Sequence, residues 1–469
     1  MNIFLYNTMY RELREFKPLK DEEAGMYACG PTVYNYAHVG NLRTYIFEDI
    51  LRRTLAYAGY RVTHVMNVTD VGHLTDDQDD GEDKMLKSSR ETGMSVWDIA
   101  EYYTKAFFKD TTRLNILDPH VVCRATEHID DMIELVKRLE KRGHTYEAGG
   151  NIYFSIDTFD QYGRMANLNL EDLQSGARIE VDQNKRNPKD FVLWFTKSKF
   201  ENQVMLWDSP WGKGYPGWHL ECSAMSMKYL GEQFDIHCGG TDHISVHHTN
   251  EIAQSEAATG KKWVRYWCHG EFLLDDTGKM SKSKGEFLTL DLLIKHGFDP
   301  LDYRYFCLGA HYRSQLRFSF QALEQAKTSR NNLAARIAEL KKDQVEAADT
   351  LDAPAQAYVD RFEAHAAKDL NMPRSLSELW GLVRDSSIAP AQRLAGCYRM
   401  DLILGLSLKD IAPAGEELLD EESASLIAER EEARKDKDFA KADTIRDILQ
   451  KRGIDIKDTP SGTVWRKRV

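Results

Sequence analysis

The sequence has no long hydrophobic run and no recognisable export signal. None of its apolar stretches approaches the roughly 20 residues that a membrane-spanning helix requires. The opening residues, MNIFLYNTMYREL, lack the basic segment followed by an apolar core that marks a secretory signal peptide. We therefore expect a cytoplasmic protein with no membrane partner.

Closely spaced cysteine pairs are also missing. The chain has seven cysteines, which is an odd number, and it has no Cys-x-x-Cys motif. The cysteines are scattered along the chain at Cys29, Cys123, Cys222, Cys238, Cys268, Cys307 and Cys397. This pattern favours a reducing compartment and argues against a disulfide framework.

The composition shows no excess of positive charge. The formal net charge is -12, which does not favour a polyanion partner for the chain as a whole, although a local basic surface can still bind one. The 469 residues are enough for about two to four domains. The 42% hydrophobic and 29% charged residues are an ordinary balance for a globular protein. We find no internal repeat.

A strand–helix–strand pattern stands near the start of the chain. Residues 26–28 read as a strand, 42–58 as a helix and 61–68 as a second strand. Such a unit predicts a parallel sheet. Two helical patterns follow within residues 95–145, and 150–215 is irregular, with NIYFSI and FVLWFT as short strand candidates.

Strand and helix patterns alternate again after this irregular segment. A helix starts near Trp218, FDIHC reads as a buried strand, HISVHHTNEIAQSEAAT as a helix stopped by Gly260, and YWCHGEFLL as another strand. From about Thr289 to Leu408 the pattern is almost entirely helical. The last segment predicts two charged helices, a turn at Gly453 and a short strand pair. The sequence thus predicts a doubly wound α/β fold with an insertion, followed by helical and small mixed modules.

The stretch MYACGPTVYNYAHVGNLRTY places a cluster, His38-Val39-Gly40-Asn41, just before the first helix. One interpretation is turn chemistry, in which Gly40 supplies backbone freedom and Asn41 is the N-cap. The other is a nucleotide site, because the amides and dipole of a helix N-terminus favour phosphate and His38 can donate to its oxygens. The residues alone leave both open.

A second cluster, Lys279-Met280-Ser281-Lys282-Ser283, is followed by Lys284-Gly285. A loop of this kind is usually a solvated surface turn. Three lysines within six residues would also make a mobile positive clamp for charge that develops on phosphate oxygens.

Potential metal ligands occur in three distant segments. Cys222 lies early in a helix, and His247 and Glu251 are four residues apart, on one helix face, with His248 as a second choice. Together with Cys29 they form a candidate zinc set, since thiolate, imidazole and carboxylate all bind zinc. The alternatives are a buried core cysteine and a surface His–Glu pair.

A calcium-like loop is rejected. Residues from Asp76 imitate the pattern with Asp80 and Gly81, but the twelfth position is Lys87, where a bidentate Glu is required. A solvated acidic loop explains this segment better.

Taken together, these motifs resemble those of the cysteinyl-tRNA synthetases, a class I aminoacyl-tRNA synthetase family. HVGN matches the first class signature with Asn41 in place of its last histidine, and KMSKS matches the second without change. PGWHLECSAMS and FDIHCGGTDHISVHHTNEIAQSEA are close to motifs of this family, and the resemblance spans nearly the whole chain. The sequence departs from many relatives in a longer acidic loop after Asp70 and in SVHH where FPHH is more common.

The resemblance implies a set of site residues. Zinc would be held by Cys29, Cys222, His247 and Glu251, and the substrate L-cysteine would lie near Thr69, Trp218 and His237. Candidates for ATP binding are His38, Gly40, Asn41, Asp242, Lys279 and Lys282, of which His38, Asn41, Lys279 and Lys282 are the catalytic candidates. ATP would enter with Mg²⁺, and the products would be cysteinyl-adenylate and then cysteinyl-tRNA(Cys).

The resemblance also assigns the domains. Residues 1–120 and 205–288 would form the Rossmann-like catalytic domain, 121–204 an inserted acceptor-end region, 289–412 a helical bundle and 413–469 an anticodon-binding module. In that module cations and rings would meet tRNA: Arg434, Lys435, Lys437, Phe439, Arg446, Trp465, Arg466, Lys467 and Arg468. The alternative there is a solvated helix face with a basic tail. A monomer is expected.

Two other functions are weighed. A ligase joining cysteine to a small amine would lack the C-terminal module, which is present here. A non-catalytic zinc or RNA-binding descendant would be expected to lose signature residues, and both signatures are retained.

Overall fold

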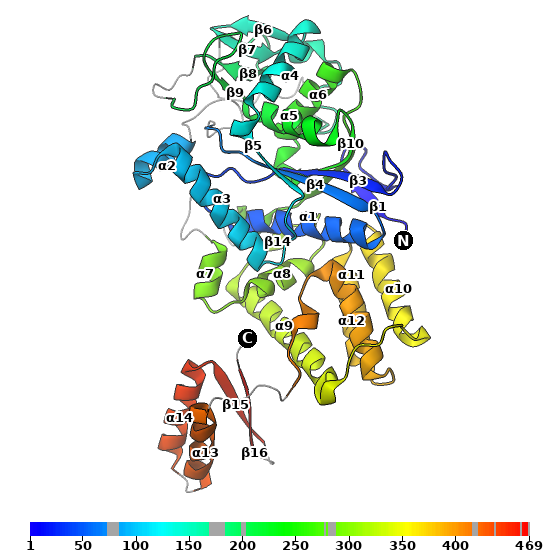
Figure 1. Ribbon diagram of the computed structural model, residues 1–469, viewed down its shortest axis with the longest axis vertical. Helices are drawn as coiled ribbons and strands as arrows, with labels where there is room; N and C mark the ends of the chain where they lie inside the picture. Colours follow the sequence, from blue (N-terminus) through cyan, green and yellow to red (C-terminus); the bar gives the residue numbers. More distant parts are fainter. Residues whose placement is uncertain are drawn as a thin grey trace. The chain divides into compact units, whose positions relative to one another are not determined.

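A parallel five-stranded sheet carries the residues of interest in the computed structural model of the chain (Figure 1). The strand order is β11-β10-β3-β4-β5. The strands are β3 (Glu23–Ala28), β4 (Arg61–Val68), β5 (Val121–Arg124), β10 (Phe234–Gly240) and β11 (Val264–Gly270). Every residue of β10 is buried, as expected for a central strand covered on both faces. The predicted strand–helix–strand start and the doubly wound fold are confirmed.

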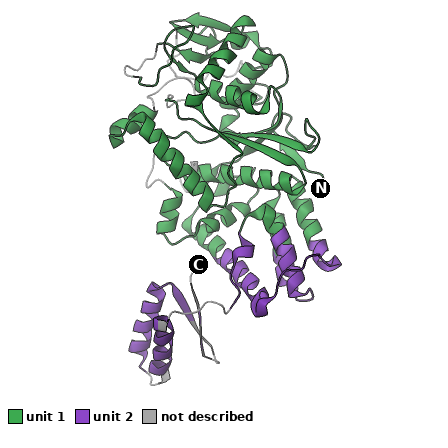
Figure 2. Ribbon diagram, in the orientation of Figure 1, with its two compact units in different colours: residues 1–327, 359–379, 400–406 green, residues 328–358, 380–399, 407–469 purple. Residues whose placement is uncertain are grey.

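The structure describes residues 1–72, 84–167, 183–197, 203–275, 278–279, 288–414, 421–435, 438–459 and 462–467. The chain divides into two units, shown in Figure 2. The first contains residues 1–327, 359–379 and 400–406, and the second contains 328–358, 380–399 and 407–469. No helix within the described ranges is both long and apolar enough to cross a bilayer.

Helices cover both faces of the parallel sheet. Helix α1 (Val39–Tyr57) packs against one face, and α5 (Trp218–Leu230) packs against the other with α6 (His247–Thr259) beside it (Figure 1). Helix α6 ends at Gly260, whose φ of 72° is left-handed, as the sequence predicts. Helices α2 (Lys84–Thr92) and α3 (Val96–Arg113) pack against each other.

A separate antiparallel sheet of four strands is inserted in the chain between β5 and β10. Its order is β6-β7-β8-β9. The strands are β6 (Thr145–Ala148), β7 (Asn151–Phe154), β8 (Phe191–Phe195) and β9 (Tyr215–Pro216), and α4 (Ile129–Lys141) precedes them. Strands β7 and β8 are the two that the sequence predicts.

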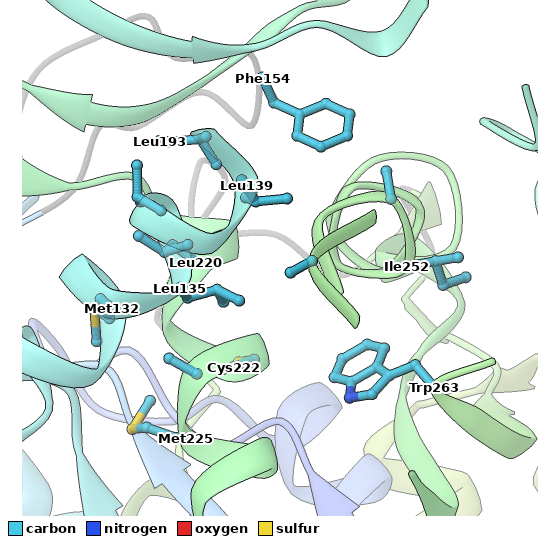
Figure 3. Packing of buried hydrophobic residues seen from close by; sticks show 14 of the residues in the cluster. Met132, Leu135, Leu139, Phe154, Leu193, Leu220, Cys222, Met225, Ile252 and Trp263 are labelled. Atoms are coloured by element: carbon cyan, nitrogen blue, oxygen red, sulfur yellow. The ribbon is translucent and has the colours of Figure 1, made fainter. Parts of the chain in front are cut away.

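One apolar cluster joins this inserted sheet to α5 and α6 (Figure 3). Phe154 and Leu193 come from the inserted sheet, Leu139 from α4, Leu220 from α5 and Ile252 from α6. All are buried, and burial of each such side chain stabilises the fold by about 1.5–3 kcal/mol. Helices α5 and α6, which carry candidate metal ligands, are therefore fixed in position by a packed core.

The predicted strand YWCHGEFLL is wrong as a single element. It divides into β11 and β12 (Leu273–Asp275), which lie in different sheets. Between them Glu271 donates its N–H to Tyr312 O at 2.8 Å, and Phe272 O accepts from Leu316 N–H at 3.2 Å. This backbone pairing with a distant segment turns the chain out of the parallel sheet.

The smaller sheets and the helical region complete the fold. Strands β1 (Phe4–Asn7) and β2 (Glu12–Glu15) form an antiparallel pair, and β12 lies between β13 (Gly278–Lys279) and β14 (Leu316–Arg317). The predicted helical region contains α7 (Leu290–Lys295), α8 (Pro300–Leu308), α9 (Phe320–Leu340), α10 (Ala353–Ala367), α11 (Met372–Arg384) and α12 (Pro390–Leu404). Short 3₁₀ turns lie at Ala125–Glu127, Ile156–Thr158, Thr241–His243, Lys342–Gln344 and Leu408–Asp410.

The last segment folds as the sequence predicts. Helices α13 (Glu421–Lys435) and α14 (Phe439–Lys451) are followed by the antiparallel pair β15 (Ile454–Thr459) and β16 (Gly462–Lys467). The turn lies at Gly453, where φ is 75°. Ile427, Ile445, Leu449 and Ile454 form its small buried core.

Candidate active site and metal centre

The carboxyl ends of the parallel strands gather the first site residues. Cys29 directly follows β3 and Thr69 directly follows β4, whereas His237 lies in the middle of β10, the strand between β11 and β3. In open parallel sheets this edge is where ligands bind. Helices α5 and α6 bring the remaining candidates to the same place.

The structure brings together the four candidate zinc ligands. The ligand atoms of Cys29, Cys222, His247 and Glu251 all lie within 4.8 Å of one another, and all four residues are buried. Within α6, His247 Nε2 is 2.8 Å from Glu251 Oε1, as expected for residues four apart on a helix. Two thiols, an imidazole and a carboxylate are a donor set that suits zinc.

A second group shares two of these residues. Cys29, His237, His248 and Glu251 also have ligand atoms within 4.8 Å of one another. His248 Nε2 is 3.3 Å from Cys29 Sγ, and His237 Nε2 is 2.9 Å from Glu251 Oε2. The sequence gives His237 only as a substrate contact and His248 only as a second choice, so this group is not foreseen as a set.

The electrostatics of the cluster favour the anionic forms of Cys222 and Glu251, but not that of Cys29. A hydrogen bond from Cys29 lowers the pKa of Cys222 to about 6, whereas burial and Cys222 raise the pKa of Cys29 well above its usual range. Burial alone would raise the pKa of Glu251, but the charges of His247 and His237 outweigh it and hold that pKa far below its ordinary value.

His247 carries the balancing positive charge. Burial lowers its pKa, but Glu251 and Cys222 outweigh burial and raise it to about 10. A metal ion at this position would displace that proton, because metal ligation requires neutral imidazole and thiolate. The donor set and its charges therefore fit a divalent metal.

A layer of aromatic and imidazole rings orients these ligands. Trp218 stacks on His247 with ring centroids 4.2 Å apart, and His219 Nδ1 lies 2.9 Å from His247 Nδ1. His248 Nδ1 is 2.8 Å from His269 Nε2. Sequence reasoning misses His219 and His269, although His219 stands three residues before Cys222 in the quoted motif PGWHLECSAMS.

The three substrate candidates surround the same cluster. Thr69 donates its hydroxyl to Glu221 Oε2 at 2.9 Å, next in sequence to Cys222, and burial raises the pKa of Glu221 well above its ordinary value. His237 stacks on Trp267 with centroids 4.7 Å apart. Thr69, His237 and Trp218 are thus close to the candidate ligands.

The cluster His38 to Asn41 begins helix α1. His38 is the N-cap, and its Nδ1 accepts the N–H of Asn41 at 3.1 Å while Asn41 Oδ1 accepts the N–H of His38 at 3.3 Å. The expectation of Asn41 as N-cap is therefore wrong; Asn41 is the third helical residue of a capping box. Because Nδ1 is an acceptor, the neutral His38 ring carries its proton on Nε2.

Gly40 is required by this arrangement. A Cβ at Gly40 would lie 2.9 Å from the His38 ring. A similar constraint applies at the end of β10, where a Cβ at Gly240 would lie 2.3 Å from Oδ1 of Asp242, the ribose candidate. These glycines let polar side chains fold back over the backbone at the sheet edge.

The lysine candidates are only partly described. Lys279 lies in β13, opposite Leu274 of β12, and its side chain is outside the described part. Lys282 lies outside the described residues, as does the acidic segment of the rejected calcium loop. Lys87, its twelfth position, lies in α2.

The tRNA candidates are dispersed over the C-terminal module. Arg434 is exposed on α13, and Phe439 is 61% exposed at the start of α14. Trp465 is half-buried against the small core of the module. Lys437 lies outside the described residues, and for Arg466 the backbone in β16 is described without its side chain.

Comparison with known proteins decides the family. Residues 15–328 match tRNA synthetases class I (C) catalytic domain, and residues 416–466 match the cysteinyl-tRNA ligase anticodon binding domain. The chain belongs to the cysteinyl-tRNA synthetase family of class I. It is therefore a ligase with a synthetase catalytic domain and a C-terminal anticodon-type module.

Similar proteins extend over the full length. The chain is 56% identical to the cysteine–tRNA ligase of Treponema denticola over all of both chains, and 49% identical to cysteine–tRNA ligase 1 of Burkholderia lata, with 98% and 96% of the two chains covered. The fold is similar to methionyl-tRNA synthetase of Mycobacterium tuberculosis, with a TM-score of 0.56 at 16% identity over 82% of this chain and 90% of the other. At that identity the likeness shows the class I synthetase fold alone.

Proposed function

We propose that this synthetase activates L-cysteine with ATP and transfers it to tRNA(Cys). The cysteine carboxylate attacks the α-phosphate of ATP, so that a carboxylate–phosphate bond forms and pyrophosphate leaves. The terminal 2′-hydroxyl of tRNA then attacks the adenylate carbonyl, and AMP leaves. The convergence of two thiols, an imidazole and a carboxylate at the carboxyl edge of the sheet carries the proposal.

Cys29, Cys222, His247 and Glu251 would hold zinc at this edge. Zinc, when bound, would supply a soft site for the substrate thiolate. Serine offers a protonated hydroxyl in place of that thiolate, and a binding site built on a specific bond discriminates better than an apolar pocket does. A separate editing site is then unnecessary.

Glu251 is held by two imidazole rings. Its Oε1 is 2.8 Å from His247 Nε2, and its Oε2 is 2.9 Å from His237 Nε2. His237 would therefore orient the carboxylate that binds the metal.

The residues before and within α1 would bind ATP. The helix N-terminus, the backbone at Gly40 and the Nε2–H of His38 present donors to phosphate, and Asn41 keeps the His38 ring in place. Lys279 and Lys282 would stabilise charge on the phosphates with Mg²⁺, and Asp242 would hold the ribose. No protein nucleophile is required.

The remaining assignments concern domains and location. Residues 1–120 and 205–288 would be catalytic, 121–204 would meet the acceptor end, 289–412 would form the bundle, and 413–469 would bind the anticodon through residues such as Arg434, Lys437, Trp465 and Arg466. We propose a cytoplasmic monomer. All seven cysteines are buried and lie outside disulfides, in keeping with a reducing compartment.

The test is exchange of radioactive pyrophosphate into ATP, measured with cysteine and with serine, together with tRNA(Cys) charging. Cysteine-dependent exchange without tRNA, followed by charging, is expected. Exchange with transfer only to a small amine would indicate the small-molecule ligase, and absence of exchange in a zinc-loaded folded protein would refute the proposal.

A further inference from the structure

One buried arginine lies a turn inside α1. Arg43 is 4% exposed and donates to four backbone carbonyls. Its Nη1 is 2.8 Å from Glu271 O and 2.6 Å from Phe272 O. Its Nη2 is 3.3 Å from His311 O and 2.5 Å from Ser314 O. Burial lowers the pKa of Arg43, so the chain retains this guanidinium at a desolvation cost that the carbonyls offset.

Two of these carbonyls belong to residues just before the lysine-bearing segment. Glu271 and Phe272 directly precede β12, after which the chain enters the segment 276–287 that contains KMSKS. At the other end of that segment, Leu288 O accepts the N–H of Val39 at 2.8 Å. The first two turns of α1 therefore hold both ends of the lysine-bearing segment.

Two further contacts reinforce the connection within the first unit. Tyr303 donates its hydroxyl to Val39 O at 2.6 Å, and a Cβ on Gly40 would lie 3.7 Å from Leu273 Cβ. In addition, β12 pairs with the backbone of Lys279. Helix start, strand and lysine are thus linked by short contacts.

We infer that Arg43 is a positioning residue that fixes β12, and with it the backbone of Lys279 in the KMSKS motif, relative to His38 and Asn41. This inference rests on the proposed ATP role of those residues. A planar fork with five donors can serve four carbonyls at once, whereas a lysine ammonium is a point donor with three. Displacement of catalytic groups by about 1 Å can cost about 100-fold in rate, so loss of the fork should slow chemistry more than binding.

The decisive variant is Arg43→Lys, which keeps the charge. We expect the single-turnover rate of cysteinyl-adenylate formation to fall 10- to 100-fold, as about 1 Å of misplacement would produce. Zinc content and the KM for cysteine should remain within about twofold, because the metal ligands lie elsewhere. Arg52→Lys is the matched control: Arg52 lies on the same helix and also donates to two carbonyls, those of Leu117 and Asp118.

A second variant loosens the other end of the segment. Val39→Pro removes the N–H that Leu288 O accepts, at the first helical position, where proline is well tolerated. It should reproduce the Arg43→Lys pattern. If either variant is poorly folded, the other still tests the inference.

Trypsin cleavage after Lys279, Lys282 and Lys284 supplies a readout besides activity. In the presence of ATP, cleavage should be faster in Arg43→Lys and Val39→Pro than in the native protein, and unchanged in Arg52→Lys. A folded Arg43→Lys protein with native adenylation rate and native cleavage would overturn the inference. If the native protein itself lacks cysteine-dependent exchange, the proposed function fails instead, and cleavage alone then reports whether Arg43 holds the segment.

Discussion

Replacement of Cys29 by serine tests the metal centre most directly. The change replaces one sulfur with oxygen in a residue that is buried and lies 3.3 Å from His248 Nε2. Serine has nearly the same shape and can keep a hydrogen bond to that ring, so the protein should fold. Only the donor chemistry changes, from a potential thiolate to a hydroxyl that stays protonated.

The expected magnitude follows from the donor set. Loss of a partner that merely supports a ligand costs about 10- to 100-fold in metal affinity, and loss of a ligand should cost at least the upper value. A 100-fold loss corresponds to about 2.8 kcal/mol. We therefore expect Cys29→Ser to lose zinc on dialysis, to raise the KM for cysteine and to narrow the preference for cysteine over serine in pyrophosphate exchange.

A matched control and two companions sharpen this test. Cys123→Ser changes a buried cysteine of β5, in the same sheet, that belongs to neither candidate group, and it should keep zinc and selectivity. Cys29 belongs to both groups, His247 only to the first and His248 only to the second. Zinc loss in His247→Asn with retention in His248→Asn therefore selects the first group, and the reverse selects the second. Full zinc content and unchanged selectivity in Cys29→Ser would refute its role as a ligand.

Three further predictions concern other parts of the chain. Lys282→Ala should slow adenylate formation at least tenfold with little change in cysteine binding, because the lysine acts on transition-state charge; an unchanged single-turnover rate contradicts this. Removal of residues after about Ala412 should leave exchange mostly intact and cripple tRNA charging, which fails as a prediction if charging is unaffected. Burial lowers the pKa of His64 to about 3. Below about pH 6.5 His64 is therefore protonated in the unfolded chain but stays neutral in the native state, which destabilises the native state. The free energy of unfolding should therefore fall by about 1.4 kcal/mol more between pH 7.5 and 5.5 in the native protein than in His64→Asn, as measured by urea unfolding.

Local patterns predict most of the catalytic fold because its signals are short-range. The strand over 61–68 and the stop of α6 at Gly260 follow from apolar runs and from a glycine that accepts a left-handed φ. The division between β11 and β12 does not, since it depends on pairing of residues 271–272 with 312–316. The nine residues of YWCHGEFLL contain no signal of backbone pairing with a segment some 40 positions away.

Only part of the site can be predicted from local sequence, because some of its residues meet through long-range packing. The spacing of His247 and Glu251 places them on one helix face, but the approach of Cys29 and Cys222 to that face depends on the packed sheet and helices, and only the family resemblance proposes it beforehand. The N-cap differs from expectation because both His38 and Asn41 can cap, and their reciprocal hydrogen bonds decide which one precedes the helix.

The contacts of Glu251 suggest a role for His237 that the ligand set alone does not. Its two oxygens contact different rings, with Oε1 2.8 Å from His247 and Oε2 2.9 Å from His237. A carboxylate held in this way would present one oxygen to a metal while the other stays hydrogen-bonded, so it would not be left as an unpaired buried charge. His237, assigned from the family to the substrate, would then act on the substrate partly through Glu251. Loss of His237 should consequently weaken cysteine binding even if its ring never contacts the amino acid.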